Sequence, residues 1–271
     1  MSVWIVLGLI LLIVGAILFF VQRNQKSRLF SIKSARKVQA AELHTTAQAI
    51  ADEIGGGNWR DYVKVWGEVK VKDPLISELK QTPCVHYAMT VKRVYEKTVT
   101  EKDSDGRTTT KTERASDTLS SNKQSVPFYV KDSSGEVLVE PDGAAMETVK
   151  VLDEFRPVED ARGGMLQFGN FSFSLGDNSF GTGGGSRTLG YQYTESILPL
   201  GRNILVVGSA SDDTGIMTLC KPTSGDKKYI ISLKSDEALA ASTEKGAQGA
   251  TLGMAICLGL GIVLLIVGIV S

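Results

Sequence analysis

The sequence predicts a mainly β domain, a sandwich or barrel of short antiparallel strands, between two transmembrane α-helices and after a juxtamembrane helix. Uncharged apolar runs stand near both ends of the chain, and most of the middle alternates polar and apolar residues between Gly- and Pro-containing turns. The predicted parts are a transmembrane helix at 1–22, a juxtamembrane helix or stalk at 23–57, the β domain at 58–243 with a flexible loop at 163–187, and a second transmembrane helix at 246–271.

The first apolar run is long enough to cross a bilayer. Residues 1–22 carry no charged side chain, and roughly 20 apolar residues span the ~30 Å hydrocarbon core as a helix that bonds its own backbone. A cleaved signal peptide would need a positive charge before the run and a small-residue cleavage site after it. Neither is present. We therefore expect an uncleaved anchor, with Trp4 at the interface.

The charges that flank the two runs predict an orientation. Residues 246–271 carry no charge, whereas six Lys and Arg residues follow the first run before any acidic residue: Arg23, Lys26, Arg28, Lys33, Arg36 and Lys37. Short flanks rich in Lys and Arg stay in the cytoplasm. We therefore expect an integral membrane protein with two spans, its β domain in the cytoplasm and both termini on the opposite side.

Glycines in both runs have the spacing of helix-packing motifs. Gly249 and Gly253 form a G-x-x-x-G, and Gly8 and Gly15 lie seven residues apart. Small residues let helices approach closely in lipid, but glycine is also common in membrane helices in general. Packing of the two spans, homo-oligomer formation and no packing role all remain open.

The composition restricts the partners and the redox chemistry. Lys plus Arg equals Asp plus Glu, at 30 each, so the chain offers no strongly basic surface for nucleic acid. Three cysteines, Cys84, Cys220 and Cys257, are too few for a disulfide framework. We expect free thiols; the alternative, a Cys84–Cys220 disulfide, needs an oxidising compartment, against the charge argument. The middle of the chain is long enough for one domain with a core or for two small ones.

Two segments have alternative interpretations. Residues 23–54 are rich in helix formers without Pro or Gly, and we prefer a rigid stalk to an amphipathic helix on the headgroups because alanine gives only a modest apolar face. Gly181 to Arg187 is glycine-rich but lacks the Gly-Lys-Ser/Thr ending of a phosphate loop, so we interpret it as part of a linker.

Asp103 to Gly106 predicts the turn of a long polar hairpin.

An ordered set of short motifs resembles one family. The motifs include Asp73-Pro-Leu-Ile-Ser77, Thr82-Pro-Cys-Val-His-Tyr87, Asp132-Ser-Ser-Gly135 and Gly190-Tyr-Gln-Tyr-Thr-Glu195. Together with the two-span layout they resemble the GIDE or "beside a membrane" domain of MULAN/MAPL-type and chloroplast outer-membrane ubiquitin ligases and of bacterial, especially cyanobacterial, relatives. The resemblance runs from about Trp59 onward. It implies structural roles for Pro74, Pro83, Cys84, Tyr87, Pro127, Phe128, Asp132, Gly135, Pro141, Gly143, Gly190, Glu195, Pro199, Gly201 and Gly208.

The sequence departs from the ligases of this family in one respect. Their RING finger binds two zinc ions through eight Cys and His ligands, whereas this sequence has three Cys and two His and reaches Ser271 within the second apolar run. We therefore expect no RING, no ubiquitin transfer by this chain and no cofactor.

Two sets of residues could carry chemistry. Cys84 and His86 are expected to share one face of a strand, about 7 Å apart, but a catalytic dyad needs direct hydrogen-bond reach and an orienting group. Acidic residues cluster in the sequence, but a metal site needs them to converge and the spacing is not that of an EF-hand. They are Asp132, Glu136, Glu140, Asp142, Asp153, Glu154, Glu159 and Asp160. We assign no catalytic, cofactor-binding or metal-ligating residue.

The preferred interpretation is a non-catalytic, membrane-anchored module that recognises an unidentified protein near the membrane. The polar Thr-rich hairpin and the Gly- and Phe-rich loop are the expected contact elements, because function often lies on loops of a rigid scaffold. Expected partners are the bilayer and the unidentified membrane-proximal protein, but no nucleic acid; a homo-oligomer remains an open alternative. The rival is a membrane-bound enzyme, a ligase-associated or hydrolytic factor that uses Cys84 and His86 or the acidic cluster; a third alternative is an architectural protein.

Overall fold

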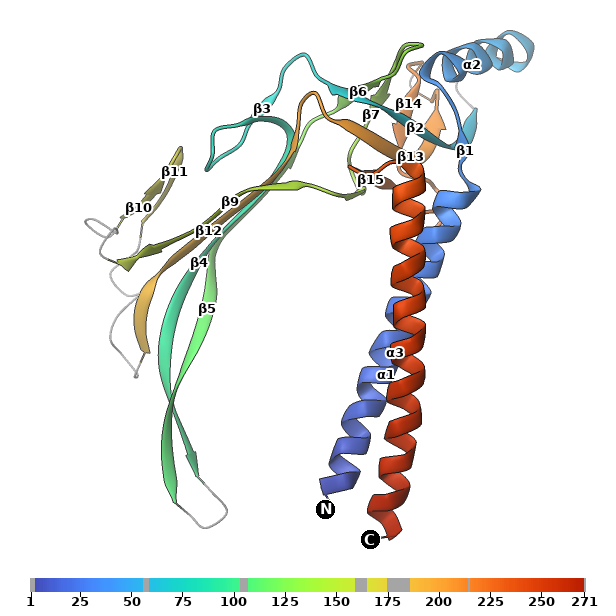
Figure 1. Ribbon diagram of the computed structural model, residues 1–271. Helices are drawn as coiled ribbons and strands as arrows, with labels where there is room; N and C mark the ends of the chain where they lie inside the picture. Colours follow the sequence, from blue (N-terminus) through green and yellow to red (C-terminus); the bar gives the residue numbers. More distant parts are fainter. Residues whose placement is uncertain are drawn as a thin grey trace. The chain divides into compact units, whose positions relative to one another are not determined.

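The computed structural model describes residues 3–55, 59–102, 107–158, 165–174, 186–213 and 215–270, which form two compact units (Figure 1). The helix–barrel unit comprises 1–68, 129–146 and 203–271, and the hairpin–sheet unit comprises 69–128 and 147–202. Strands predominate between two long apolar helices, which confirms the predicted fold class.

The helix–barrel unit is a small closed barrel with helices attached. Its helices are α1 (Val3–Ser34), α2 (Ala40–Ile54) and α3 (Asp236–Val270). Its strands are β1 (Arg36–Lys37), β2 (Arg60–Lys70), β6 (Phe128–Lys131), β7 (Glu136–Val139), β8 (Ala145–Met146), β13 (Asn203–Ser211), β14 (Thr218–Cys220) and β15 (Ile230–Ser232). The order β2-β6-β7-β14-β13 closes on itself because β13 also pairs with β2.

Strand β13 is buried on both of its faces. Every residue from Ile204 to Ser211 is buried. Alternate side chains of a barrel strand point to opposite faces, so both faces of β13 are covered. Leu205 and Val207 pack in a cluster with Ile32 of α1, Ala35 directly after it and Leu239 of α3. The barrel therefore has its outer face covered where the two long helices reach it.

Lys64 on β2 joins both long helices to the barrel. Its Nζ donates to the carbonyl oxygen of Ile32 in the last turn of α1, at 3.1 Å, and forms an ion pair of 2.7 Å with Asp236, the first residue of α3. Cations at helix C-termini and anions at N-termini complement the helix dipole. Both side chains of the ion pair are largely buried, so solvent screens the pair less than a surface pair.

Helices α1 and α3 pack against each other through glycines. Gly8 faces Gly261 so closely that a Cβ on Gly8 would lie 3.0 Å from the Gly261 carbonyl oxygen, and a Cβ on Gly15 would lie 2.6 Å from Leu258. Gly253 has Leu18 beside it, whereas Gly249 has no described atom within 4 Å of a Cβ position. The close approach therefore follows the seven-residue spacing of Gly8 and Gly15, and Gly249 takes no part in it.

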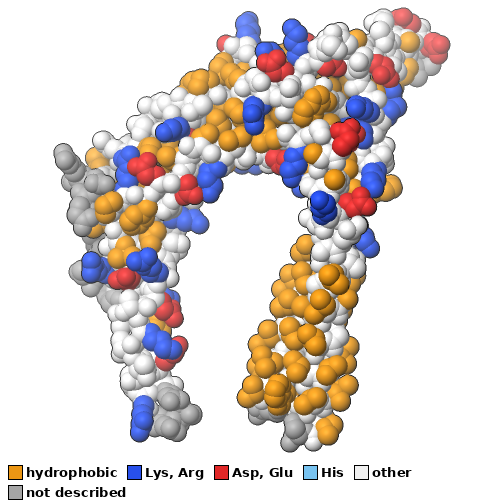
Figure 2. Space-filling view, in the orientation of Figure 1, with side chains coloured by type: hydrophobic (Ala, Val, Ile, Leu, Met, Phe, Trp, Pro, Cys, Tyr) orange, Lys and Arg blue, Asp and Glu red, His pale blue; other side chains and the backbone are white. Residues whose placement is uncertain are grey.

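Both helices are long and apolar enough to cross a membrane. Figure 2 shows hydrophobic side chains over the part of the pair near the termini and charged side chains toward the barrel. Gln22 and Thr251 mark the change, since Gln22 Nε2 donates to Thr251 Oγ1 at 2.8 Å. The pairing satisfies two polar groups that would be costly to leave unbonded in an apolar surrounding.

The hairpin–sheet unit is built on two long strands. Its strands are β3 (Leu75–Ile76), β4 (Pro83–Lys102), β5 (Thr108–Ser125), β9 (Val149–Pro157), β10 (Met165–Phe168), β11 (Phe171–Ser174) and β12 (Ser186–Pro199). The sheet has the order β3-β4-β12-β9, and β5 pairs with β4 along its whole length. The core of the unit includes Tyr87, Met89, Val91 and Tyr193. The predicted polar hairpin is thus β4–β5, while its turn at 103–106 lies outside the described residues.

The predicted juxtamembrane helix is interrupted. Helix α1 continues to Ser34, the chain is then extended, and α2 begins at Ala40. Helix propensity is a weak preference that tertiary bonding overrides: β1 pairs with β2, and the Val38 amide donates to the Lys64 carbonyl oxygen. The prediction of one helix over 23–54 was therefore wrong at residues 35–39.

Part of the predicted flexible loop at 163–187 is ordered. Residues 165–174 form the hairpin β10–β11, in which Gly169 adopts a positive φ of 58° at the turn. Its aromatic side chains supply the order, since Phe168 lies 4.9 Å from Tyr193 and Phe171 stacks on Phe173. The Gly- and Ser-rich composition concealed this apolar alternation; residues 175–185 lie outside the described residues.

The glycine contact predicts an asymmetric effect of two neighbouring substitutions. Gly261→Leu should destabilise the chain by roughly 1–3 kcal/mol, because the new side chain enters the packed seam. Gly259→Leu should change stability by about 0.5 kcal/mol or less, because no described atom lies within 4 Å of its Cβ position. Thermal unfolding of the full chain in one detergent, followed by circular dichroism, measures both; equal effects would contradict the packing.

Candidate interaction site

The structure separates Cys84 from His86. Cys84 lies in the core cluster with Tyr87 and Met89, and the register of β4 against β12 shifts by one residue between them. The extra residue at Val85 places the Cys84 side chain on the same face of the strand as Tyr87 and Met89, opposite His86. The expectation that Cys84 and His86 share one face was therefore wrong. A β-bulge inserts one residue and reverses the alternation in this way.

Neither side chain is prepared for acid–base or nucleophilic chemistry. Burial and then the Glu195 carboxylate raise the pKa of the Cys84 thiol to about 11, although a bond to the His86 backbone opposes this. Burial and the charge of Lys123 lower the pKa of His86 to about 4. His86 Nδ1 lies 2.7 Å from Ser125 Oγ. At neutral pH the thiol is protonated and the imidazole is uncharged and bonded to a hydroxyl.

The acidic cluster does not converge. Asp132, Glu136, Glu140 and Asp142 belong to the helix–barrel unit, whereas Asp153 and Glu154 belong to β9 of the other unit. Asp153 accepts from Lys150 at 2.7 Å, and Glu154 accepts from Arg156 at 2.8 Å. Within the described ranges no group of three or more His, Cys, Asp or Glu is arranged for a metal ion. Glu159 and Asp160 lie outside those ranges.

In the hairpin–sheet unit, the motif residues form a latch around Glu195. This carboxylate is fully buried on β12. Its Oε1 accepts from the Leu79 amide at 2.8 Å, and its Oε2 accepts from Ser77 Oγ at 2.9 Å and from the Lys80 amide at 2.8 Å. A buried charge is tolerated only when it is well hydrogen-bonded. Glu195 therefore fastens the β3–β4 connection onto the sheet.

The other motif residues of this unit fill positions where the backbone turns or approaches closely. Gly190 lies where a Cβ would collide with the Arg156 carbonyl oxygen, and Gly201 adopts a positive φ of 69° at the β12–β13 turn. Tyr87 and Phe128 are buried apolar residues. Pro74, Pro83, Pro127 and Pro199 lie at or next to strand ends, where a missing amide disrupts no ladder.

In the helix–barrel unit, Asp132 begins the turn between β6 and β7 and caps a distant helix. Its Oδ1 accepts from the amides of Ser134 and Gly135, and its Oδ2 accepts from the amide of Ala40, the first residue of α2, at 2.8 Å. Ser134 Oγ accepts from the Ala41 amide at 3.0 Å. Gln39 stands at the N-cap position of α2 without a side-chain cap bond. The turn supplies from 92 residues away the acceptors that an N-cap residue normally provides.

Burial works to raise the pKa of Asp132, but hydrogen bonds from Ser134, Ala40 and Gly135 outweigh it, so that the pKa is lowered.

The remaining motif residues of this unit shape nearby turns. Pro141 accepts from the Ala144 amide across a turn in which Gly143 has a φ of 77°. Gly208 lies against the Tyr229 ring, where a Cβ would come within 2.7 Å.

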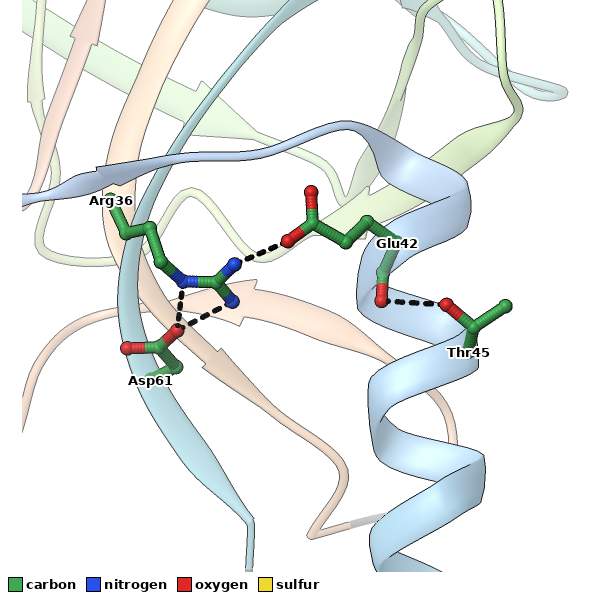
Figure 3. Close-up of polar contacts among 4 residues, drawn as sticks. All are labelled: Arg36, Glu42, Thr45 and Asp61. Atoms are coloured by element: carbon green, nitrogen blue, oxygen red, sulfur yellow. Dashed lines mark hydrogen bonds and ion pairs between the residues drawn. The ribbon is translucent and has the colours of Figure 1, made fainter.

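Arg36 fixes α2 to the barrel from the other side. Its guanidinium bonds the Asp61 carboxylate on β2, with Nη2 at 2.8 Å, and also pairs with Glu42 on α2 (Figure 3). Its Nε also donates to Asp61 Oδ2, at 3.0 Å, so two N–H groups converge on one charged oxygen. The hydrogen bonds of Asp61 and then Glu42 raise the pKa of Arg36, so the guanidinium stays charged. Helix α2 is thus held at its first turn by both the β6–β7 turn and β1.

An open groove of about 720 Å³ lies beside this attachment. Trp66, Glu42, Lys37, Lys131 and Ser133 are among the residues that line it. Trp66 is 36% exposed, although a large aromatic side chain is usually well covered. Small-molecule sites are enclosed and mostly apolar, whereas this groove is open and carries both signs of charge. It has the properties of a surface that binds a polypeptide around an aromatic anchor.

Sequence reasoning missed the residues of this groove. Trp66 and Lys37 were interpreted only as members of a strand and of a basic flank. An outward-facing Trp at an alternating position of β2 was the available signal, but the sequence does not show which face of a barrel strand is covered. The three cysteines are free, as expected.

The chain matches one protein family over more than half of its length. The family model GIDE, described as an E3 ubiquitin ligase, matches residues 96–267, which is more than half of the chain. A comparison with curated proteins gave no match, and a comparison with solved structures gave none. The matched range begins within β4 and ends within α3, so Pro74, Pro83, Cys84 and Tyr87 precede it. Over that range the match confirms the resemblance inferred from the motifs.

The bond from the start of α2 to Asp132 predicts a local loss of stability when this carboxylate is removed. Asp132→Ala should destabilise the first turn of α2 by roughly 1–2 kcal/mol, because the amides lose their acceptors. Hydrogen exchange of the full chain in detergent should then quicken about 5–30-fold at the first amides of α2. Ser134→Ala should act in the same direction. Ser133→Ala is the matched control, because Ser133 makes none of these bonds; acceleration in the control of equal size would contradict the cap.

The environment of His86 predicts a pH dependence. Between about pH 6.5 and 4 the unfolded chain binds a proton at this residue that the folded chain does not. The free energy of unfolding should therefore fall on acidification through this window, by up to about 3 kcal/mol at 1.36 kcal/mol per pH unit. Chemical unfolding at several pH values measures the slope. His86→Gln should flatten it, and His44→Gln, which alters an exposed histidine, should not.

Proposed function

The chain belongs to the GIDE family, and we propose that it is a membrane-anchored recognition module that binds a protein partner at the membrane surface. The groove beside α2 carries this proposal. It combines an exposed Trp66 with Lys37, Lys131 and Glu42 at its edge. Trp is the residue most enriched among interface hot spots, and a rim of mixed charge supports orientation of a partner.

The helix beside the groove is held firmly to the barrel, which favours a preformed binding surface over a mobile loop. Asp132 and Arg36 hold α2 from two sides, so the groove keeps its shape before a partner arrives. Preorganised sites lose less conformational entropy on binding. The two apolar helices further concentrate the module in the plane of the membrane, which raises its effective concentration for partners held there.

The proposed side of the membrane is the cytoplasm. Arg23, Lys26 and Arg28 follow the apolar part of α1 directly, and such flanks are retained on the cytoplasmic side. Because α1 and α3 run antiparallel with both ends of the chain at the end of the pair away from the barrel (Figure 1), the termini would then lie together on the opposite side.

The proposal assigns no transfer chemistry to these 271 residues. A RING needs eight Cys and His ligands, and the sequence has three Cys and two His. The enzyme alternative has no geometric support in the described part of the chain, because Cys84 is a protonated core thiol and the acidic residues do not converge. Within the family's ubiquitin-ligase activity, this chain would serve recognition.

Site-specific photo-crosslinking in membranes tests the groove. A crosslinking phenylalanine analogue at Trp66 should capture one discrete protein, and the same analogue at Tyr129, an aromatic residue of similar exposure on β6, should not. In the same membranes, Trp66→Ala should weaken association with the captured protein by about 30-fold or more, the effect of losing a hot-spot Trp. Equal capture from both positions would contradict a groove-specific partner. Capture of a second copy would show that the groove serves self-association.

A further inference from the structure

A second pocket, separate from the groove, lies beside the membrane-proximal part of α1. It has a volume of about 470 Å³ and is lined by residues of α1 and of the β14–β15 connection, including Asn24, Arg28, Lys221, Lys227 and Lys228. Four of its side chains are cationic. No Asp or Glu belongs to the lining among the residues that the structure describes, although the chain as a whole has no net charge. The pocket is therefore a local concentration of positive charge.

The wall of the pocket is fastened to the helix. The Lys228 amide donates to Ser31 Oγ of α1 at 3.1 Å, and the Lys228 carbonyl accepts from the Tyr62 hydroxyl at 2.7 Å. Tyr229 donates its hydroxyl to the carbonyl oxygens of Glu140 and Leu219. The connection that carries three of the cations is thus bonded to α1 and to the barrel.

A motif glycine makes room for one of these cations. The side chain of Lys221 lies across Gly143, where a Cβ would come within 2.8 Å of Lys221 Cδ. Any larger residue at 143 would displace this lysine, and the positive φ of Gly143 also disfavours one. Three carboxylates lie near the lining without belonging to it: Asp226 accepts a hydrogen bond from Ser224 Oγ, and Glu140 and Asp142 act on Tyr229. Against these three anions the lining itself places four cations.

The depth of the pocket matches the lipid headgroups. Asn24 and Arg28 lie three and seven residues beyond Val21, the end of the apolar run, or about 4.5 and 10 Å along a helix. The headgroup layer on each side of a bilayer is about 5–7 Å thick. Asn24 therefore lies within the headgroup layer and Arg28 a few ångströms beyond it, a distance that a long cationic side chain can span. Asn24, Thr223 and Ser224 add neutral hydrogen-bonding groups to the lining.

We propose that this pocket binds the phosphate of an anionic phospholipid headgroup. Basic pockets beside membrane helices bind such headgroups through charge-assisted hydrogen bonds. The bound lipid would hold the β14–β15 connection against α1 and thereby set the orientation of the barrel on the membrane. This binding is independent of the protein partner of the groove.

Native mass spectrometry of the full chain, extracted from nanodiscs of mixed phosphatidylglycerol and phosphatidylcholine, tests the site. The chain should retain phosphatidylglycerol in preference to phosphatidylcholine. Lys221→Gln with Lys228→Gln should weaken retention about 25-fold, or about fivefold for each charge. Gly225→Trp should also weaken retention without a change of charge, because Gly225 belongs to the lining and no described atom within 4 Å of its Cβ position excludes a large ring there.

The charge-matched control is Lys26→Gln with Lys33→Gln, two cations of α1 that lie outside the pocket lining. It should weaken retention by about fivefold at most, because Lys33 already pairs with Glu244 at 3.5 Å. Circular dichroism confirms that each variant is folded. Equal loss in the control, or retained lipid in Gly225→Trp, would overturn the pocket in favour of diffuse attraction. Displacement of the lipid by excess inorganic phosphate would overturn the headgroup as the ligand in favour of free phosphate.

Discussion

The bonds of one lysine connect the membrane helices to the barrel. Lys64 Nζ bonds the Ile32 carbonyl oxygen of α1 and the Asp236 carboxylate of α3, while its own carbonyl accepts the Val38 amide. Removing one partner of a partly buried ammonium costs more than breaking a surface pair, because it strands a charge. The end of α1, the extended segment before α2 and the start of α3 all take their places relative to β2 through this residue.

The glycine seam and Lys64 together explain why the groove and the basic pocket occur on one unit. The seam holds α1 and α3 side by side, and Lys64 sets the end of that pair against the barrel. Strand β1 and α2 then follow on one side, with the groove around Trp66. The β14–β15 connection is bonded to α1 through Ser31, with the basic pocket beside it. Each surface depends on a rigid junction more than on its own loops.

Three residues of the family motifs make contacts that hold the backbone in place. Asp132 caps α2, Glu195 latches the β3–β4 connection, and Gly143 leaves space for Lys221. All three satisfy backbone donors or permit close approach, and none presents a reactive group. Asp132 and Gly143 are recognisable in a sequence as turn formers, whereas the burial of Glu195 appears only in the structure. Their partners are not recognisable in the sequence, because Ala40 and Asp132 lie 92 residues apart and no local pattern relates them.

The sequence alone determined the two apolar helices, the β character of the middle and the residues of the motifs, because hydropathy, alternation and turn chemistry are local properties. Only the tertiary structure decided where α1 ends, that residues 165–174 form a hairpin, and that a bulge separates Cys84 from His86. It also decided that Gly8 and Gly15, but not Gly249, lie in the helix contact. These outcomes depend on which surfaces meet, and contacts between distant segments override local preference.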